Sequence, residues 1–353
     1  MKTKRIENSV FTPNITTYTY PGILSTELLE KPLIDIPALS TLYTIRPGIR
    51  SNEQLHILNP ISTILEKGTN TCIPTYSQGG SITGKTLTTG LFEVNRSWCK
   101  KEFQGLLSTY NVYGDDPSYV GNGLSGYELG GKLRAKVLNS LLGTLQQDIF
   151  KVAFLGQTAY SGSSVYSTID GLWTNYLDGF GSYCIKPVYN ALPNGATSVL
   201  NANQARDTFR LMWGQAPTTL RSRMASALGG VKLFVTGSMW DNYLNSLEDN
   251  CCVEGSWRLL QDGTKTLYYR GIELVPLWIL DYTLENEANP YTGLLRHFAI
   301  LTSPSNNVFG VESTSDLNNL ELCYDCKDKT TYIQGEMRFG VNYIHCDETV
   351  IAY

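Results

Sequence analysis

The stretch GGSITGKT, residues 79–86, fits the phosphate-binding pattern G-x-x-x-x-G-K-[ST] at Gly79, Gly84, Lys85 and Thr86. In a phosphate loop a buried strand precedes the first glycine and a helix follows, so that helix amides face the phosphates. Here the preceding EKGTNTCIPTYSQ is polar, and the following TLTTGLFEVNRSW alternates with a period of two. Both flanks favour a Gly/Ser/Thr-rich turn in a long hairpin, with a P-loop nucleotide-binding enzyme as the alternative.

Three cysteines near the C-terminus are of a type that binds zinc. Cys323 and Cys326 have C-x-x-C spacing, and His345-Cys346 follows about twenty residues later. Neighbouring strand residues point to opposite faces, so His345 and Cys346 are poorly placed to bind one ion together. The pattern favours strand and turn cysteines over a zinc site at Cys323, Cys326 and Cys346. We expect the eight cysteines to be reduced, mostly as small buried apolar residues.

The other reactive residue types form no catalytic pattern. The chain has three histidines: His56, His297 and His345. None stands beside a nucleophile motif, and G-x-S-x-G is absent. The segment DYTLENEANPYTG carries Asp281, Glu285 and Glu287 without calcium-loop spacing, which predicts a solvated loop. We therefore expect no enzyme and no cofactor.

The composition limits the possible partners. Only 17% of the 353 residues are charged and the net charge is −4, so no basic surface for sequence-specific nucleic-acid binding is indicated. The start MKTKRIENSV lacks the apolar core of a secretory signal, and no stretch reaches the roughly 18 to 20 apolar residues of a membrane span. We expect a protein that stays in a cytosol and contacts no membrane.

The elements that hold these residues differ along the chain. Residues 1–50 are broken by five prolines yet rich in Leu, Ile and Tyr, which predicts an extended arm lying on another surface. Apolar residues at steps of three and four predict one long helix over about 132–154, with Gly156 as its left-handed C-cap. Helices are also predicted near residues 203–213 and from Ser238, before mostly strand-forming segments. This mixture predicts an α+β fold.

The order of these elements resembles the major capsid proteins of tailed bacteriophages with the HK97-type fold. LFEVNRSWCKKEFQGLL resembles the strand that leaves the E-loop, and KLRAKVLNSLLGTLQQDIFKVAFLG resembles the spine helix. KLFVTGSMWDNYLNSL followed by YYRGIELVPLWIL resembles the axial domain, and EMRFGVNYIHCDETVIAY resembles the closing strands. Within the family the likeness is greatest to proteins of Bacteroidota phages, including crAss-like phages.

The resemblance implies a division of the whole chain. The segments are an N-terminal arm (1–50), an E-loop hairpin (51–97), a peripheral domain with the spine helix (98–158), an axial domain (159–315) and closing peripheral strands (316–353). Arm and hairpin overlie adjacent subunits in such proteins. The inter-subunit contacts then fall on Tyr18, Tyr20, Leu24, Lys67, Lys85, Phe92 and Trp98.

The implied role is mechanical. Such subunits assemble in the host cytoplasm as hexamers and pentamers into an icosahedral virion capsid around double-stranded DNA. A separate scaffolding protein, a portal protein and a decoration protein are the partners that this implies, and the packaged DNA lies nearby without specific contacts. Some relatives crosslink a hairpin lysine to an asparagine, but no motif singles out Lys67, Lys85 or Asn342, for which we expect ordinary surface roles. An encapsulin-like nanocompartment shell is the alternative with the same fold.

Overall fold

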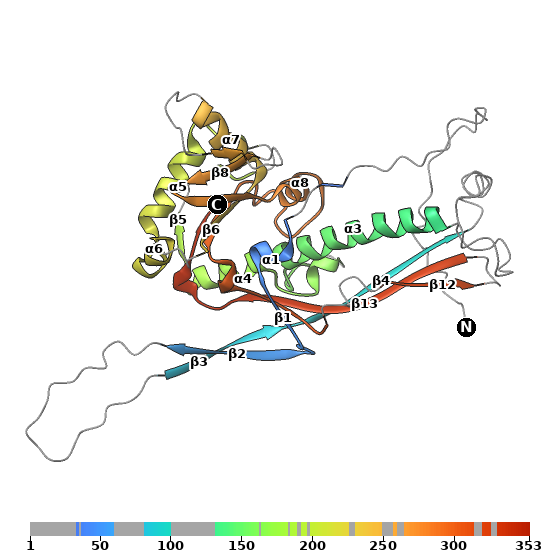
Figure 1. Cartoon of the computed structure of the whole chain (residues 1–353). Helices are drawn as coiled ribbons and strands as arrows, with labels where there is room; N and C mark the ends of the chain where they lie inside the picture. Colours follow the sequence, from blue (N-terminus) through green and yellow to red (C-terminus); the bar gives the residue numbers. More distant parts are fainter. Residues whose placement is uncertain are drawn as a thin grey trace, which may run out of the picture. The chain divides into compact units, whose positions relative to one another are not determined.

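Figure 1 shows the helices and strands of the computed structural model along the chain. The chain divides into two units, each of three chain segments. Unit 1 comprises Met1–Ile34, Leu91–Ile149 and Thr314–Met337, and unit 2 comprises Asp35–Gly90, Phe150–Ser313 and Arg338–Tyr353. The structure describes residues 33–34, 37–59, 81–99, 131–161, 164–182, 184–188, 192–195, 198–225, 230–248, 257–259, 265–313, 320–325 and 330–353. This division cuts across the predicted domains, because most of the hairpin and residues 35–50 belong to unit 2.

Unit 1 is built on a long helix and on strands. The helix α3 runs over Gly131–Leu155, one residue further than predicted at each end, and its last turn belongs to unit 2. Strand β12 (Glu321–Asp325) pairs antiparallel with β13 (Thr330–Tyr343), which β4 (Gly90–Cys99) also pairs. The N-terminal segment touches α3, since Gln147 Nε2 donates to the Ile34 carbonyl at 2.6 Å. This end of the arm therefore lies on a surface of its own chain.

Unit 2 contains a seven-stranded sheet. Its strands, in spatial order, are β5 (Lys186–Val188), β14 (Thr349–Ala352), β10 (Ala299–Thr302), β6 (Lys232–Val235), β9 (Ile272–Pro276), β8 (Lys265–Tyr269) and β7 (Trp257–Leu259). Antiparallel β10 and β14 set Ile300 opposite Ile351, and β6 sets Phe234 beside the same residue. Because every residue of β10 and β14 is buried, both faces of the sheet centre are covered.

The two faces of this sheet bury different side chains. On one face, Leu233, Val350 and Leu301 pack with helical residues such as Phe209 and Met239. On the other face lie Phe234, Ile300 and Ile351, all fully buried. A separate aromatic cluster in unit 2 joins Phe154, Trp173 and Phe298, with ring centroids 5.1–6.1 Å apart. The strand alternation in the sequence thus accounts for the two core layers.

Helices of unit 2 form where apolar residues recur at helical spacing. They are α4 (Leu172–Gly181), α5 (Gln204–Gln215), α6 (Thr218–Ala225), α7 (Gly237–Glu248) and α8 (Trp278–Asn286). Short 3₁₀ turns cover η2 (Val165–Ser167), η3 (Pro304–Asn306) and η5 (Cys346–Glu348). Helix α8 corrects the prediction of a solvated loop from residue 281, since Ile279, Leu280 and Leu284 are buried on one of its faces.

Gly156 does not have the left-handed conformation predicted for a C-cap, because it is absent from the positive-φ glycines of the described residues. Its role is a close approach. A Cβ at Gly156 would stand 2.5 Å from the Ile169 carbonyl oxygen, and Gly171 N donates to the Gly156 carbonyl at 2.8 Å. The glycine therefore permits the segment before α4 to pack directly against the end of α3.

Part of the predicted arm is folded into unit 2, which corrects the expectation of an extended arm up to residue 50. Helix α1 covers Leu39–Leu42, and β1 (Thr44–Pro47) pairs in parallel with β11 (Asn307–Val311), which pairs antiparallel with β13. Tyr43 is 1% exposed and its hydroxyl donates to the Ala153 carbonyl at 3.2 Å. The apolar residues between the last two prolines of this segment account for the burial.

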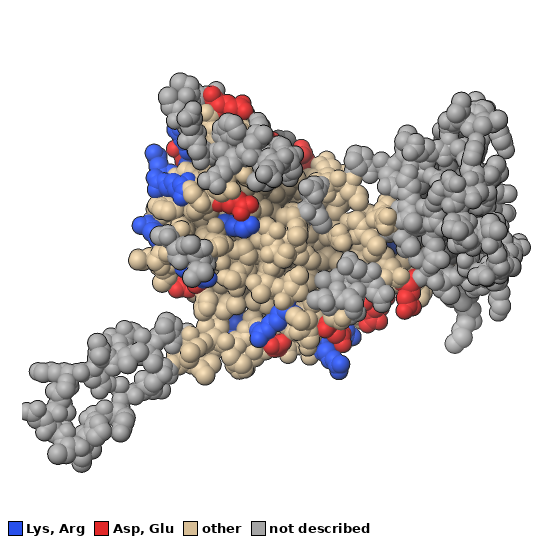
Figure 2. Space-filling model, in the orientation of Figure 1, with Lys and Arg blue, Asp and Glu red and all other residues tan. Residues whose placement is uncertain are grey.

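Charged side chains are sparse on the described surface. On the face shown in Figure 2, small groups of basic and acidic residues are separated by larger uncharged areas. Among the described residues, no helix is both long and apolar enough to cross a membrane. Those residues also contain no cluster of three potential metal ligands.

Candidate functional site

The phosphate-loop motif lies in a strand. Gly84, Lys85 and Thr86 belong to β3 (Ser81–Thr88), which pairs antiparallel with β2 (Asn52–Asn59) over its whole length. After β3 the chain continues into strand β4 instead of a helix, so no helix N-terminus faces these residues. This corrects both the nucleotide-site alternative and the predicted turn at residues 81–86. Gly79 lies outside the described residues.

Lys85 lies on the hairpin face that packs against β13 within unit 2. Its Nζ is 2.8 Å from the centroid of the Tyr343 ring on β13. Burial lowers the pKa of Lys85 to about 7, and the Asp178 carboxylate acts in the opposite direction. Asn342 is also buried, and its Nδ2 donates to the Thr86 carbonyl at 2.8 Å. Neither residue has the surface role expected from the sequence, since both fasten the hairpin root to β13.

Apolar packing strengthens this root. Leu55 and Leu87 are buried together with Ile49 and Val308. Gly340 of β13 sits beneath the root, and a Cβ there would collide with the Thr88 backbone. The hairpin is therefore held by its inward face, within unit 2.

The outward face of the hairpin is uncovered. Residues on this face alternate with the inward ones, and Leu58 pairs directly with Ile82 across the two strands. Leu58 is 71% exposed and Ile82 is 68% exposed, although both are large aliphatic side chains. Nearer the root the same face is polar, with Gln54 beside Thr86. We call Leu58 and Ile82 the apolar hairpin pair.

The other predicted contact residues are distributed differently. Tyr18, Tyr20, Leu24 and Lys67 lie outside the described residues. Phe92 on β4 is only 9% exposed and offers little surface to a neighbour. Trp98 lies near the end of β4, and its side chain is not among those described. The apolar hairpin pair was not among the residues expected from the sequence, although the period of two could have indicated its exposed face.

The cysteine prediction is also changed by the structure. Cys346 begins η5 and forms a disulfide with Cys184, whose Cα lies 5.4 Å away. Parallel pairing of β5 with β14 brings these two distant segments together, at a Cα separation that suits a disulfide. Cys346 is thereby used in a bond that excludes zinc ligation, and the expectation of reduced cysteines is corrected for this pair. Cys326 lies outside the described residues.

A second arrangement was not predicted at all. It joins Ser238 at the start of α7, Asp281 on α8 and His297 before β10. Ser238 Oγ lies 2.7 Å from His297 Nδ1 and 3.3 Å from Asp281 Oδ1, and the Ser238 amide donates to Asp281 Oδ2 at 3.2 Å. Ser238 is 43 residues from Asp281 and 59 residues from His297 in the sequence, so no local motif predicts the cluster. The predicted helix start at Ser238 thus has a carboxylate from another helix as its partner.

The cluster has the residue types of a Ser-His-Asp catalytic triad but not its arrangement. In a triad the carboxylate orients the histidine, whereas here Asp281 contacts the serine. His297 Nε2 instead faces the Ser198 carbonyl at 3.0 Å. Burial raises the pKa of the Asp281 carboxyl and lowers the pKa of the His297 imidazole. The set favours neutral, hydrogen-bonded groups over an activated nucleophile.

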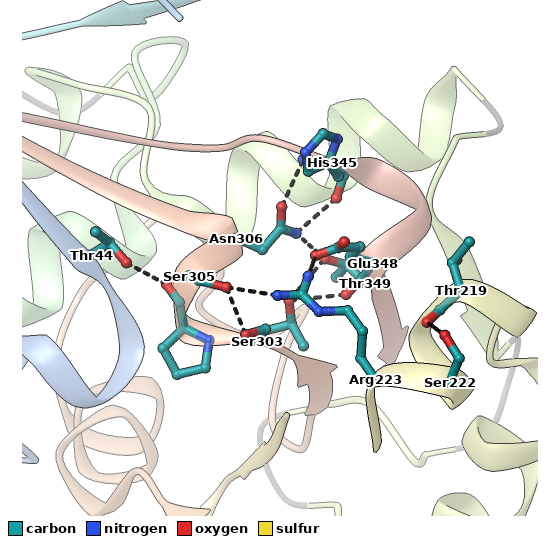
Figure 3. A network of polar contacts seen from close by, with 12 residues as sticks. Thr44, Thr219, Ser222, Arg223, Ser303, Ser305, Asn306, His345, Glu348 and Thr349 are labelled. Atoms are coloured by element: carbon teal, nitrogen blue, oxygen red, sulfur yellow. Dashed lines mark hydrogen bonds and ion pairs between the residues drawn. The ribbon is translucent and has the colours of Figure 1, made fainter. Parts of the chain in front are cut away.

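A third polar cluster lies beside the start of β14 (Figure 3). The Asn306 carboxamide on η3 accepts from the His345 amide at 2.7 Å and donates to the His345 carbonyl at 2.7 Å. Arg223 on α6 points between Glu348, with which it forms an ion pair, and Ser305. These contacts connect α6, η3 and η5 beside β14, so the cluster stabilises the fold.

The comparisons with known proteins concern this fold. No protein family model matches the chain, and no curated protein matches it. Solved structures match over nearly its full length. The satellite phage P4 procapsid including size determination (Sid) protein has a TM-score of 0.54 and 10% identity, covering 93% of this chain and 93% of the other.

Two further structures agree. The capsid structure of the cyanophage P-SCSP1u has a TM-score of 0.52 and 12% identity, with 95% and 92% of the two chains covered. The structure from Mycobacterium phage Che8 has a TM-score of 0.50 and 12% identity, with 96% and 97% covered. The chain therefore has the α+β fold of HK97-type phage capsid structures, as expected from the sequence.

Proposed function

We propose that this chain is the major capsid protein of a tailed phage, a structural subunit that assembles through the outward face of its hairpin. The fold supports this proposal, since two of the matched structures are, by their titles, a procapsid and a capsid. The observation that carries it is the apolar hairpin pair, which protrudes from a hairpin whose root is firmly packed.

The pair is costly for an isolated subunit and favourable for an assembly. Burial of a Leu or Ile side chain contributes roughly 1.5–3 kcal/mol each. In a closed shell this gain recurs at each copy, because every subunit presents the same surface to its neighbour. A single copy leaves both side chains in water. The hairpin therefore favours self-association, and a second copy of this chain is its partner.

The finer features of the proposal follow the resemblance. The assemblies are hexamers and pentamers that enclose double-stranded DNA in the virion, formed in the host cytoplasm with a separate scaffolding protein and a portal protein. A decoration protein would bind the finished shell. The arm residues Tyr18, Tyr20 and Leu24 and the hairpin Lys67 belong to the same inter-subunit contacts. We place the source among Bacteroidota phages, including crAss-like phages.

The test compares the purified full chain with two single substitutions by negative-stain microscopy and sedimentation. Leu58→Asp places a charge in the proposed contact, and Leu294→Asp is the matched control, since Leu294 is 69% exposed on another part of unit 2. We expect rings or closed shells for the unchanged chain and for Leu294→Asp, and monomers for Leu58→Asp. A monomer at high concentration for the unchanged chain contradicts the proposal.

The ratio of absorbance at 260 and 280 nm on the same particles separates two shell types. Nucleic acid inside virion-derived particles supports the phage capsid. An encapsulin-like compartment would hold a protein cargo and show no DNA absorbance. If Leu58→Asp assembles as the unchanged chain does, the shell role stands but the hairpin contact is wrong.

A further inference from the structure

The cluster of Ser238, Asp281 and His297 lies within unit 2 and joins the start of α7, the middle of α8 and the residues before β10. His297 is 2% exposed, and Asp281 is half-buried beside Ser238. Proton binding at this cluster is a property of the folded chain and is independent of the proposed shell function.

The tautomer of His297 follows from its hydrogen bonds. Its Nε2 lies 3.0 Å from the Ser198 carbonyl oxygen, which can only accept, so Nε2 carries a hydrogen. In a neutral imidazole the other nitrogen, Nδ1, is then an acceptor. Ser238 Oγ, 2.7 Å away, must donate to it.

A count of hydrogens now shows a deficit. The Ser238 hydroxyl has one hydrogen but faces two acceptors, His297 Nδ1 and the ionised Asp281 Oδ1. Thr236 Oγ1 lies 3.2 Å away as a third acceptor for the same serine hydrogen, so it adds to the deficit. With neutral His297 and ionised Asp281, one of the two close contacts therefore has no hydrogen.

One added proton supplies the missing hydrogen, so that both the Ser238–His297 and the Ser238–Asp281 contact become hydrogen bonds. Placed on Asp281 Oδ1, it is donated to Ser238 Oγ, and the serine hydroxyl donates to His297 Nδ1. Placed on His297 Nδ1, it reverses both hydrogen bonds and leaves Asp281 ionised. The same three heavy-atom positions serve either arrangement, and the serine hydroxyl links the two ends.

The charges around the cluster decide which end is favoured. Burial raises the pKa of Asp281, Glu285 adds to this effect, and Arg296 and the hydrogen bonds from Ser238 oppose it. Burial and the Arg296 charge lower the pKa of His297, while its bond to Ser198 acts oppositely. Arg296 itself pairs with Glu285 at 3.3 Å. Both shifts favour the proton at Asp281 with a neutral imidazole.

We propose that Asp281, Ser238 and His297 form a proton-binding site. The three residues bind one proton, the Ser238 hydroxyl links Asp281 to His297, and the resulting hydrogen bonds connect α7, α8 and the residues before β10. The ligand is the proton alone. The site holds these three elements together in the folded subunit, with the proton located on the carboxyl group.

The sign of the pH dependence follows by linkage. Between the ordinary pKa values of 3.8 and 6.5, the unfolded chain carries one proton on His297; the folded chain carries one on Asp281 up to the raised pKa of that carboxyl. The two states hold equal numbers of protons where Asp281 stays protonated, so this site gives no slope of unfolding free energy with pH. Removing either end breaks this compensation.

The two ends give opposite slopes. In Asp281→Asn only the lowered pKa of His297 remains, so the unfolded chain binds more protons and stability rises with pH up to 6.5. In His297→Gln only the raised pKa of Asp281 remains, so stability is present below 3.8 and is lost as pH rises through the folded value.

The test is urea unfolding of the full chain at several values between about pH 4 and 6, the window set by these pKa values. We compare the slope of the unfolding free energy against pH with that of the unchanged chain. We expect this slope to change by the equivalent of up to about one bound proton, becoming more positive for Asp281→Asn and more negative for His297→Gln. Asp347→Asn, at an exposed aspartate, is the control and should show no shift. Equal slopes for all four proteins would overturn the proposal.

A second measurement needs no substitution that could impair folding of the cluster. The ¹⁵N spectrum of histidine-labelled protein reports the tautomer and protonation of each ring. The His297 signals, assigned with His56→Gln and His345→Gln variants, should remain those of the Nε2–H tautomer across this pH range. A His297 ring that becomes doubly protonated near its ordinary pKa would equally exclude the shared proton.

Discussion

The centre of the seven-stranded sheet and the β2–β3 hairpin are both β structures of unit 2, yet the sheet buries its apolar side chains and the hairpin exposes two of them. In the sheet, Phe234, Ile300 and Ile351 are fully buried. In the hairpin, Leu58 and Ile82 stand in water on the face opposite the packed root. The sheet thus stabilises the folded chain, whereas the hairpin pair leaves its apolar surface exposed to solvent.

The largest expected effect comes from truncating the sheet core. Phe234→Ala removes a fully buried ring and leaves a cavity between β6 and its neighbours. We expect the free energy of unfolding to fall by about 3–5 kcal/mol. Urea unfolding of the subunit measures this, and a loss below about 1 kcal/mol would mean that the sheet centre repacks freely.

The next effect separates two strand glycines that frame the hairpin root. At Gly340 a Cβ would meet the Thr88 backbone, which cannot swing away, whereas at Gly84 it would meet only the flexible Gln54 side chain. We expect Gly340→Ala to cost about 1–3 kcal/mol and Gly84→Ala to stay within about 0.5 kcal/mol. Thermal unfolding of both variants tests the difference, and equal losses would contradict the close backbone approach.

A smaller effect concerns pH and the hairpin root. Because the pKa of Lys85 is lowered to about 7 in the folded chain, the unfolded chain binds more protons between about 7 and 10.5. Stability should therefore rise with pH in this window. Lys85→Met removes the titrating group and should flatten that rise in urea unfolding at pH 7 and 9. An unchanged slope would show that Lys85 is not buried at the root.

The smallest expected effect on the subunit is that of Leu58→Ser. Its side chain is largely in water, so we expect the free energy of unfolding to change by less than about 0.5 kcal/mol. The same substitution should weaken association measurably by sedimentation. A large loss of subunit stability would mean that the hairpin face is covered within its own chain.

The regular elements with long-range periodicity were accessible from the sequence. Repeats of three and four predicted α3 to within one residue at each end, and alternation predicted β4 and the later part of β13 as strands, whereas β3 was predicted as a turn. Helix α8 was missed because its acidic residues read as a solvated loop, while Ile279, Leu280 and Leu284 supply the buried face. Gly156 was predicted to end α3 by its backbone angles, but tertiary packing against Gly171 explains it instead.

The polar clusters could not be read in the same way. Ser238, Asp281 and His297 meet only because α7, α8 and the β10 end converge, and their separations in sequence carry no periodic signal. The disulfide of Cys184 with Cys346 depends likewise on the parallel pairing of β5 with β14. The phosphate-loop motif shows the converse, since a matching local pattern was overruled by its strand context.

The position of β14 has a consequence for how the protein is made. Residues Thr349–Ala352 form an inner strand of the seven-stranded sheet, between β5 and β10, although they come after all its other strands in the chain. Synthesis proceeds from the N-terminus, so this sheet cannot close until residue 352 has left the ribosome. A chain translated only as far as residue 348 lacks this strand, so β5 and β10 then have no partner between them.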